Sequence, residues 1–93
     1  MDIAEFQESM RRIYLSRDSG RGIWGTFAWL VEEVGELSRA LREGENEVTV
    51  SEFADVMAWL ASLANLCGVN LDSAVSKYSQ GCPKCGFTPC RCP

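Results

Sequence analysis

Two long stretches of the chain repeat apolar residues every three or four positions, and this spacing constrains the fold more than any other feature of the sequence. It places the apolar residues on one face of a helix. Residues 23–43 and about 49–67 are therefore predicted to form two helices, each with one apolar stripe. The two stripes are Phe27, Leu30, Val31, Val34, Leu37 and Leu41, and Phe53, Val56, Met57, Leu60, Leu63 and Ala64.

Shorter segments with the same spacing lie at both ends of this pair. Residues 2–16 predict an N-terminal helix capped by Asp2. A turn-rich segment, SRDSGRG, predicts a loop after it, and ENEVTV predicts a second connector after Gly44. Two further helix starts are predicted by their capping residues, at Thr49 or Ser51 and at Asn70. Four residues of the last helix are expected to face inward: Leu71, Ala74, Val75 and Tyr78.

The prediction is an all-α fold in which residues 1–80 form an antiparallel helical bundle. Residues 81–93 hold four of the five cysteines and all three prolines, so they are predicted to be a separate irregular appendage. Cys67, at the end of the third helix, is predicted to be a small core residue. At 93 residues the chain buries only about 60 to 65 % of its unfolded surface, which favours a homodimer or homotetramer.

Composition excludes several classes of function. Histidine is absent, which excludes Ser-His and Cys-His catalytic pairs and all histidine-containing metal sites. The net charge of -4 argues against a stable nucleic-acid complex, because such binding depends on clustered Lys and Arg. The N-terminus has no signal-peptide pattern and no segment is apolar over the length of a membrane span, so we expect a cytoplasmic protein without a membrane partner.

Five acids lie beside the two apolar stripes rather than opposite them. Glu32, Glu33 and Glu36 flank the first stripe, and Glu52 and Asp55 lie three apart beside the second. Antiparallel packing through the stripes would bring these acids together, where their charges repel each other. A divalent cation compensates such repulsion, and hard oxygen ligands suit Mg²⁺ or Mn²⁺. The alternative is a solvated acidic surface that pairs with Arg residues of another chain.

This arrangement, EExxE followed by ExxD, resembles the signature of the all-α nucleotide pyrophosphohydrolases, specifically the MazG-like group. The flanking segments WLVEEVGEL and EFADVMAWLASLA extend the resemblance over most of residues 23–80. It implies hydrolysis of nucleoside triphosphates to the monophosphate and pyrophosphate. It also implies Mg²⁺ ligands, and Glu33 or Glu32 beside it is the candidate to accept the proton of the attacking water. The implied ligands are Glu33, Glu36, Glu52 and Asp55.

Four residues are candidates for binding the substrate. Lys77 is the preferred phosphate contact, although it also suits a solvated helix surface. Arg21 lies in the predicted loop and is either solvated or directed at an anion. Trp59 lies one turn after Asp55, and it either stacks on a nucleobase or completes the core; Trp24 presents the same choice.

The tail sequence CPKCGFTPCRCP predicts a metal site of its own. Cys82 and Cys85 enclose a turn typical of zinc knuckles, and Cys90 and Cys92 supply two further thiolates. Four thiolates in a reducing compartment favour a tetrahedral zinc site. The Cys-x-Cys spacing also leaves open disulfides, a redox role or a disordered tail.

Two functions from different classes follow from these patterns. The first is a Mg²⁺-dependent nucleotide pyrophosphohydrolase with a structural zinc ion. The alternative is a non-enzymatic helical interaction module with a zinc-stabilised tail, whose acids bind a basic protein surface. The response of thermal stability to Mg²⁺ separates the two.

Overall fold

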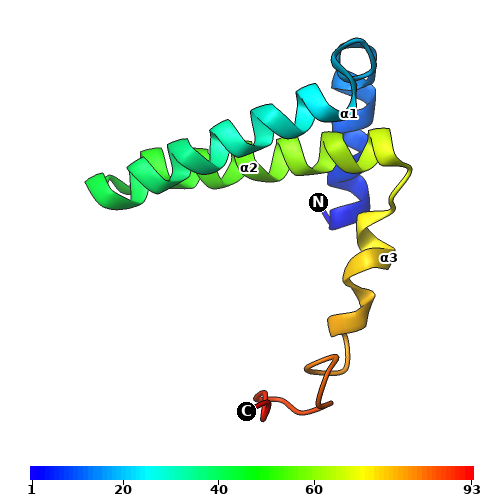
Figure 1. Cartoon of the computed structure of the whole chain (residues 1–93), viewed down its shortest axis with the longest axis vertical. Helices are drawn as coiled ribbons and strands as arrows, with labels where there is room; N and C mark the ends of the chain where they lie inside the picture. The colour runs from blue at the N-terminus through cyan, green and yellow to red at the C-terminus, as the bar shows by residue number, and fades with distance from the viewer.

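A computed structural model describes the whole chain, residues 1–93, and contains only helices and irregular segments. Helix α1 spans Ile3–Glu43, α2 spans Asn46–Cys67 and α3 spans Leu71–Val75. A single 3₁₀ turn, Ser76–Tyr78, follows α3 and leads into the irregular cysteine-rich end of the chain (Figure 1). The predicted all-α class with a cysteine-rich appendage is therefore confirmed.

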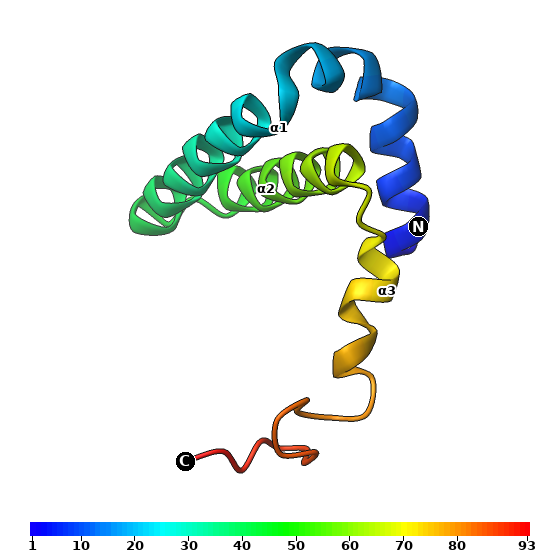
Figure 2. The same ribbon diagram turned by 45° about the vertical axis from the view of Figure 1, so that its right-hand side comes forward.

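Helix α1 contains a sharp bend at Gly22, where two separate helices and a loop were predicted. Gly22 has φ 83° and ψ 173°, a conformation that residues with a side chain rarely adopt. The residues before it, SRDSGR, remain helical, so the predicted loop is wrong except at this one position. A salt bridge from Arg21 to the buried Asp18, one turn apart, joins two of these polar residues. Figure 2 shows the N-terminal arm, residues 3–21, turning away from the rest of α1 at this bend.

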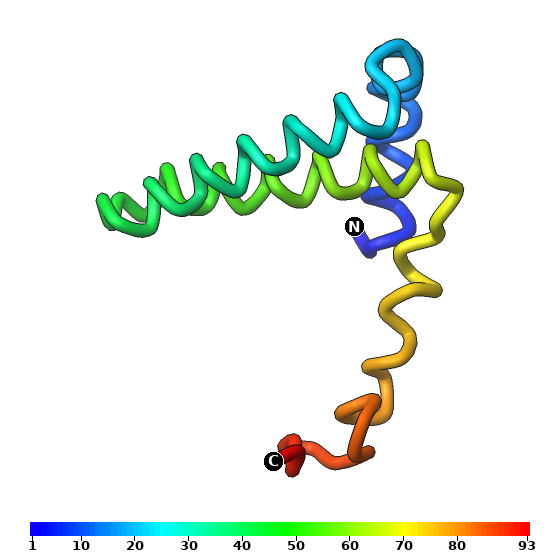
Figure 3. The backbone as a smooth tube through the Cα atoms, in the orientation of Figure 1, coloured from blue at the N-terminus to red at the C-terminus, as the bar shows by residue number.

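The second part of α1 and α2 form an antiparallel helical hairpin (Figures 1 and 3). Gly44 ends α1 in the left-handed conformation, and its N–H donates to the carbonyl oxygen of Ala40 at 2.9 Å. The predicted connector is wrong, because α2 begins at Asn46 and ENEVTV is mostly helical. No glycine or proline interrupts that segment. Glu47 lies in the first turn of α2, where a negative charge stabilises the helix by interacting with its dipole.

Hydrogen bonds fasten the N-terminal arm to the end of the hairpin. Asp2 caps α1 as predicted and forms a reciprocal capping box with Glu5. Farther along the arm, Gln7 donates to the side chain of Asn65 at 3.0 Å and accepts from the N–H of Leu71 at 2.9 Å. Asn65 in turn donates to the backbone carbonyl of Gln7 at 3.2 Å. These contacts fix the arm across the C-terminal end of α2.

The chain beyond α2 departs from the hairpin, as Figures 1 and 2 both show. Asn70 caps α3 as predicted by accepting from the N–H of Ser73 at 3.0 Å. The prediction of an inward-facing side is wrong for three of its four residues, since only Leu71 is partly buried; Ala74, Val75 and Tyr78 are exposed. Cys67 is exposed too and is not a core residue. No further helix of this chain lies against that side of α3, so nothing covers these residues.

The interior of a single chain is small and partly polar. Its buried apolar residues are Met10, Ala40, Ala61 and Ala64, and its buried polar residues are Asp18, Thr26 and Ser62. Several large residues of the predicted stripes remain exposed: Phe27, Val31, Val34, Leu41, Phe53, Met57 and Leu60. The hairpin thus buries only part of each stripe. No single helix is long and apolar enough to cross a membrane; α2 taken with Leu71–Tyr78 meets those criteria as a pair bent by 107°.

Candidate active site

Three carboxylates from two helices meet in the middle of the hairpin. Glu33 extends from α1, and Glu52 and Asp55 extend from successive turns of α2. One oxygen from each side chain lies within 4.8 Å of an oxygen of both others. The antiparallel pairing and the three-residue spacing on α2 produce this arrangement, which we call the carboxylate cluster.

The electrostatics of the cluster favour a bound cation. Burial raises the pKa of Glu33 above its ordinary value of 4.5, and the charges of Asp55, Glu52 and Glu36 raise it further. One carboxylate oxygen of Glu52 is buried without any hydrogen-bond partner. Such an oxygen carries a desolvation cost that a cation would remove. Hard oxygen ligands at this spacing fit Mg²⁺ or Mn²⁺, so the donor set is chemically suited to the predicted metal.

The other two predicted acids lie beside the cluster. Glu36 contributes to the raised pKa of Glu33, but its carboxylate forms a salt bridge with Arg39 one turn farther along α1. Glu32 is exposed and does not belong to the group of three. The structure therefore brings together Glu33, Glu52 and Asp55, with Glu36 at their edge.

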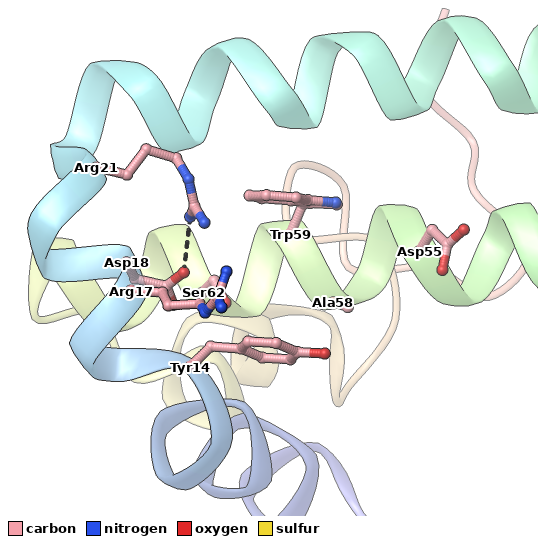
Figure 4. A pocket seen from close by; sticks show the side chains of 8 residues that line it. All are labelled: Tyr14, Arg17, Asp18, Arg21, Asp55, Ala58, Trp59 and Ser62. Carbon is pink, nitrogen blue, oxygen red and sulfur yellow. Dashed lines mark hydrogen bonds and ion pairs between the residues drawn. The ribbon is translucent and has the colours of Figure 1, made fainter.

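A cavity of about 300 Å³ lies next to the cluster, between α2 and the bent part of α1 (Figure 4). Asp55 belongs to both the cavity and the cluster, so the two form one continuous site. The cavity combines aromatic, cationic and acidic side chains. Its lining residues are Tyr14, Arg17, Asp18, Arg21, Asp55, Ala58, Trp59 and Ser62.

Inside the cavity, one guanidinium group joins an acid to an aromatic ring. Arg21 donates from Nη1 to Oδ1 of Asp18 at 2.8 Å, and its guanidinium carbon lies 4.7 Å from the centroid of the Trp59 ring. Trp59 also stacks on Trp29, with 5.8 Å between centroids and an interplanar angle of 16°. Trp59 is therefore held in a fixed position at the wall of the cavity.

The remaining predicted substrate contacts lie elsewhere. Trp24 is 81 % exposed and packs edge-on against Phe27, and it does not line the cavity. Lys77 lies on the 3₁₀ turn, with its ammonium group 5.3 Å from the centroid of the Tyr78 ring. Of the four predicted contacts, the structure brings Arg21 and Trp59 to the site.

Sequence reasoning missed Asp18, the most deeply buried acid of the chain. The sequence predicts a loop over SRDSGRG, which includes Asp18, yet Asp18 is only 2 % exposed. Its three-residue spacing from Arg21 is a signal of helical pairing. That signal was obscured by the serines and glycines around it, which are typical of turns.

The four tail cysteines converge on one point. The sulfur atoms are 3.6 Å apart for Cys82 and Cys90, 3.7 Å for Cys82 and Cys92, and 3.9 Å for Cys85 and Cys90. Four sulfurs bound tetrahedrally to zinc at about 2.3 Å lie about 3.8 Å from one another. The thiols are therefore spaced as the edges of such a tetrahedron, and no disulfide joins them.

Backbone N–H groups of the two tail turns stabilise thiolates. Those of Arg91 and Phe87 lower the pKa of Cys85 from 9.0 to about 6, and those of Cys85 and Lys84 lower the pKa of Cys82. The neighbouring thiols raise the pKa of Cys92 to about 11. Four thiols this close cannot all ionise without a cation, and a soft divalent ion such as zinc suits a four-sulfur set.

The fold and site define a class: a small helical protein in which two antiparallel helices share a carboxylate cluster beside an aromatic cavity. The family model for the MazG nucleotide pyrophosphohydrolase domain matches residues 24–86, and the chain belongs to this family. The match includes all the cluster acids, Trp59 and the first two tail cysteines. The N-terminal arm with Asp18 and Arg21 lies outside it. A comparison with curated proteins finds no match.

Proposed function

We propose that this protein hydrolyses nucleoside triphosphates between the α and β phosphates, releasing the nucleoside monophosphate and pyrophosphate. The observation that carries the proposal is the carboxylate cluster, with its unpartnered Glu52 oxygen, in a member of a nucleotide pyrophosphohydrolase family. The continuity of the cluster with the aromatic cavity supports a nucleotide as substrate, because one molecule then reaches both.

Glu33, Glu52 and Asp55 are the proposed ligands of Mg²⁺ or Mn²⁺. Glu36 would become a further ligand by leaving its salt bridge with Arg39. A metal ion held there would supply positive charge for the triphosphate oxygens and would activate the attacking water. The protein residues position these partners across two helices, so the separation of the ligands is set by helix packing. Arg39, once released, remains close enough to balance part of the acidic charge.

For the proton of the attacking water we assign Glu33 rather than Glu32. Glu33 lies among the cluster acids, where its second oxygen can accept a proton from a water beside the triphosphate. Glu32 is on the exposed side of α1, and it is retained as a residue that orients solvent at the rim.

The substrate is proposed to enter the cavity with its base toward Trp59 and its phosphates toward Asp55. Arg21 and Arg17 then supply cationic contacts, which an anionic substrate requires in a chain of net charge -4. Trp24 and Lys77 lie outside the cavity of their own chain, and we propose that they contact substrate only in an oligomer.

We further propose that the protein is a homodimer or homotetramer. Exposed stripe residues support this assembly: Phe53 is 54 % exposed and Val31 is 53 % exposed, on the two helices that form the site. A second copy of the chain would cover these faces with the same kind of apolar surface. The small interior of one chain makes such burial a large part of its stability.

For the tail, Cys82, Cys85, Cys90 and Cys92 are proposed to hold one structural zinc ion. The tetrahedral sulfur spacing supports it, and a closed four-thiolate site leaves no position for a substrate. Separate thiols rather than disulfides also agree with a protein of the reducing cytoplasm, where we place it.

The proposed activity is tested by measuring pyrophosphate release from a panel of NTPs and dNTPs with Mg²⁺ or Mn²⁺. Wild type should release pyrophosphate only with metal, and Glu52→Gln should lose the activity. Glu43→Gln is the matched control, because Glu43 is an exposed acid outside the cluster on α1. If Glu43→Gln and Glu52→Gln lose activity equally, the cluster is not the reaction centre.

The interaction-module alternative is retained as the competing function. It would be favoured by a folded protein that releases no pyrophosphate from any nucleotide and whose stability does not respond to Mg²⁺. The unpartnered Glu52 oxygen within the cluster favours the enzyme, since a protein-binding acidic surface would be solvated.

A further inference from the structure

Asp18 is a buried carboxylate with an unused hydrogen-bond acceptor. Its side chain lines the cavity and is only 2 % exposed, yet one of its two oxygens, Oδ2, has no donor. Buried acceptors without a donor are rare because they lose their hydration and gain nothing in return. A molecule that enters the cavity and displaces Arg21 could supply the missing donor.

The contacts of Arg21 indicate the chemical shape of that molecule. Its planar guanidinium lies over Trp59 at 4.7 Å and donates an N–H to Asp18 at 2.8 Å. The cavity thus already accommodates a flat group that donates an N–H to Asp18 and places its planar face over the Trp59 ring. The guanidinium side chain is also partly exposed, so it is able to leave this position toward the open side of the cavity.

Among the common nucleobases, guanine has the edge that matches. Its N1–H and 2-amino group are two adjacent donors on one carbon, which is the same guanidine fragment that Arg21 carries. The pairing edges of adenine, cytosine and uracil each place a lone pair beside the donor, and that lone pair would repel a carboxylate. Once Arg21 releases its oxygen Oδ1, the Asp18 carboxylate therefore selects guanine.

We propose that Asp18 is the residue that selects the base, by accepting hydrogen bonds from N1–H and the 2-amino group of a guanine stacked on Trp59. The inference rests on the proposed function, and it specifies guanine nucleoside triphosphates as the preferred substrates. Guanine displaces the guanidinium of Arg21 from Trp59 and Asp18, and Arg21 then moves toward the open side of the cavity. Figure 4 supports this orientation, because Trp59 lies between Asp18 and Asp55 along the cavity.

The test compares kcat/KM for GTP, ITP, ATP and XTP. Wild type should prefer GTP over ITP, which lacks the 2-amino group. Asp18→Asn should lower kcat/KM for GTP by about 10- to 100-fold and raise it for XTP, because the carboxamide donates to the C2 oxygen of xanthine. Asp72→Asn, at an exposed acid on α3, is the matched control and should leave the ratios unchanged.

A binding measurement separates this inference from the proposed activity. Calorimetric titration of the metal-free protein with GMP should give binding that Asp18→Asn abolishes, while AMP and CMP bind weakly to both. Equal kcat/KM for GTP and ITP, or a loss in Asp18→Asn that is the same for every base, overturns the role of Asp18 and leaves the hydrolysis standing. If no triphosphate is hydrolysed, the proposed function fails, and the GMP titration alone then decides whether Asp18 selects guanine.

Discussion

Glu33 on α1 and Asp55 on α2 present carboxylate oxygens within 4.8 Å of each other, with Glu52 completing the group. Burial and the nearby charges of Asp55 and Glu52 raise the pKa of Glu33, so the pairing opposes folding unless a cation lies among the acids. The hairpin holds these charges together by helix packing. Carboxylates that are held close together despite their repulsion, next to a cavity, are typical of a functional site.

Metal should stabilise the protein through this cluster. At a Mg²⁺ concentration about 100 times Kd, mass action adds about 2.7 kcal/mol, which raises the Tm of a domain of this size by about 10 °C or more. Asp55→Asn should abolish the rise, and Glu43→Gln should retain it. Differential scanning calorimetry with and without Mg²⁺ measures the effect. An equal rise in both variants would place the metal elsewhere.

Stability without metal should depend on pH through Glu33. Its pKa in the folded state is raised above 4.5. Between pH 4.5 and this raised pKa, the folded protein therefore binds more protons than the unfolded chain. The stability that this group contributes is therefore full below the unfolded pKa and is lost as pH rises through the folded pKa. The urea midpoint of wild type relative to Glu33→Gln should fall across this window. A relative midpoint that rises with pH would mean that the Glu33 carboxylate is stabilised rather than strained.

The tail should contain about one zinc ion per chain. Because the four thiolates are ligands, a thiol reagent should find one reactive cysteine, Cys67, in the native protein and five after chelation. Cys90→Ser should lose the zinc, and Cys67→Ser is the control that keeps it. Substitution by Co²⁺ should give the visible absorption of a tetrahedral thiolate complex. Zinc-free protein in which all five thiols react at once would contradict the site.

The exposed stripe should mediate self-association. Phe53→Glu introduces a charge into apolar surface that we assign to contacts between copies, so the assembly should dissociate to monomers with a lower Tm. Light scattering coupled to gel filtration measures the mass. Lys84→Glu, on the tail, is a control that should remain assembled. A wild-type monomer of 10.3 kDa would contradict the assembly.

Much of the helical architecture was predictable because it depends on local signals. The caps at Asp2 and Asn70 and the ends at Gly44 and Gly68 all follow from residues whose side chains or backbone freedom determine helix boundaries. The pairing of Glu33 with Asp55 also followed, since both acids flank stripes that must pack together. These features require no knowledge of the whole chain.

The errors arose where distant contacts outweigh local preference. The segment before Gly22 has the composition of a turn, but it is helical, and its Asp18 lies against the same cavity as Trp59 and Ser62 of α2. Asp18 is consequently a buried residue of the site rather than a loop residue. The exposure of Tyr78 was equally unpredictable, because amphipathic spacing does not tell whether the covering surface belongs to the same chain.

The most direct test of the account is the identity of the products. Wild-type protein with GTP and Mg²⁺ should give GMP and pyrophosphate in equal amounts, resolved by ion-exchange chromatography, and Asp55→Asn should give neither. GDP with inorganic phosphate, or products that persist undiminished in Asp55→Asn, would contradict cleavage at the α–β bond by the carboxylate cluster.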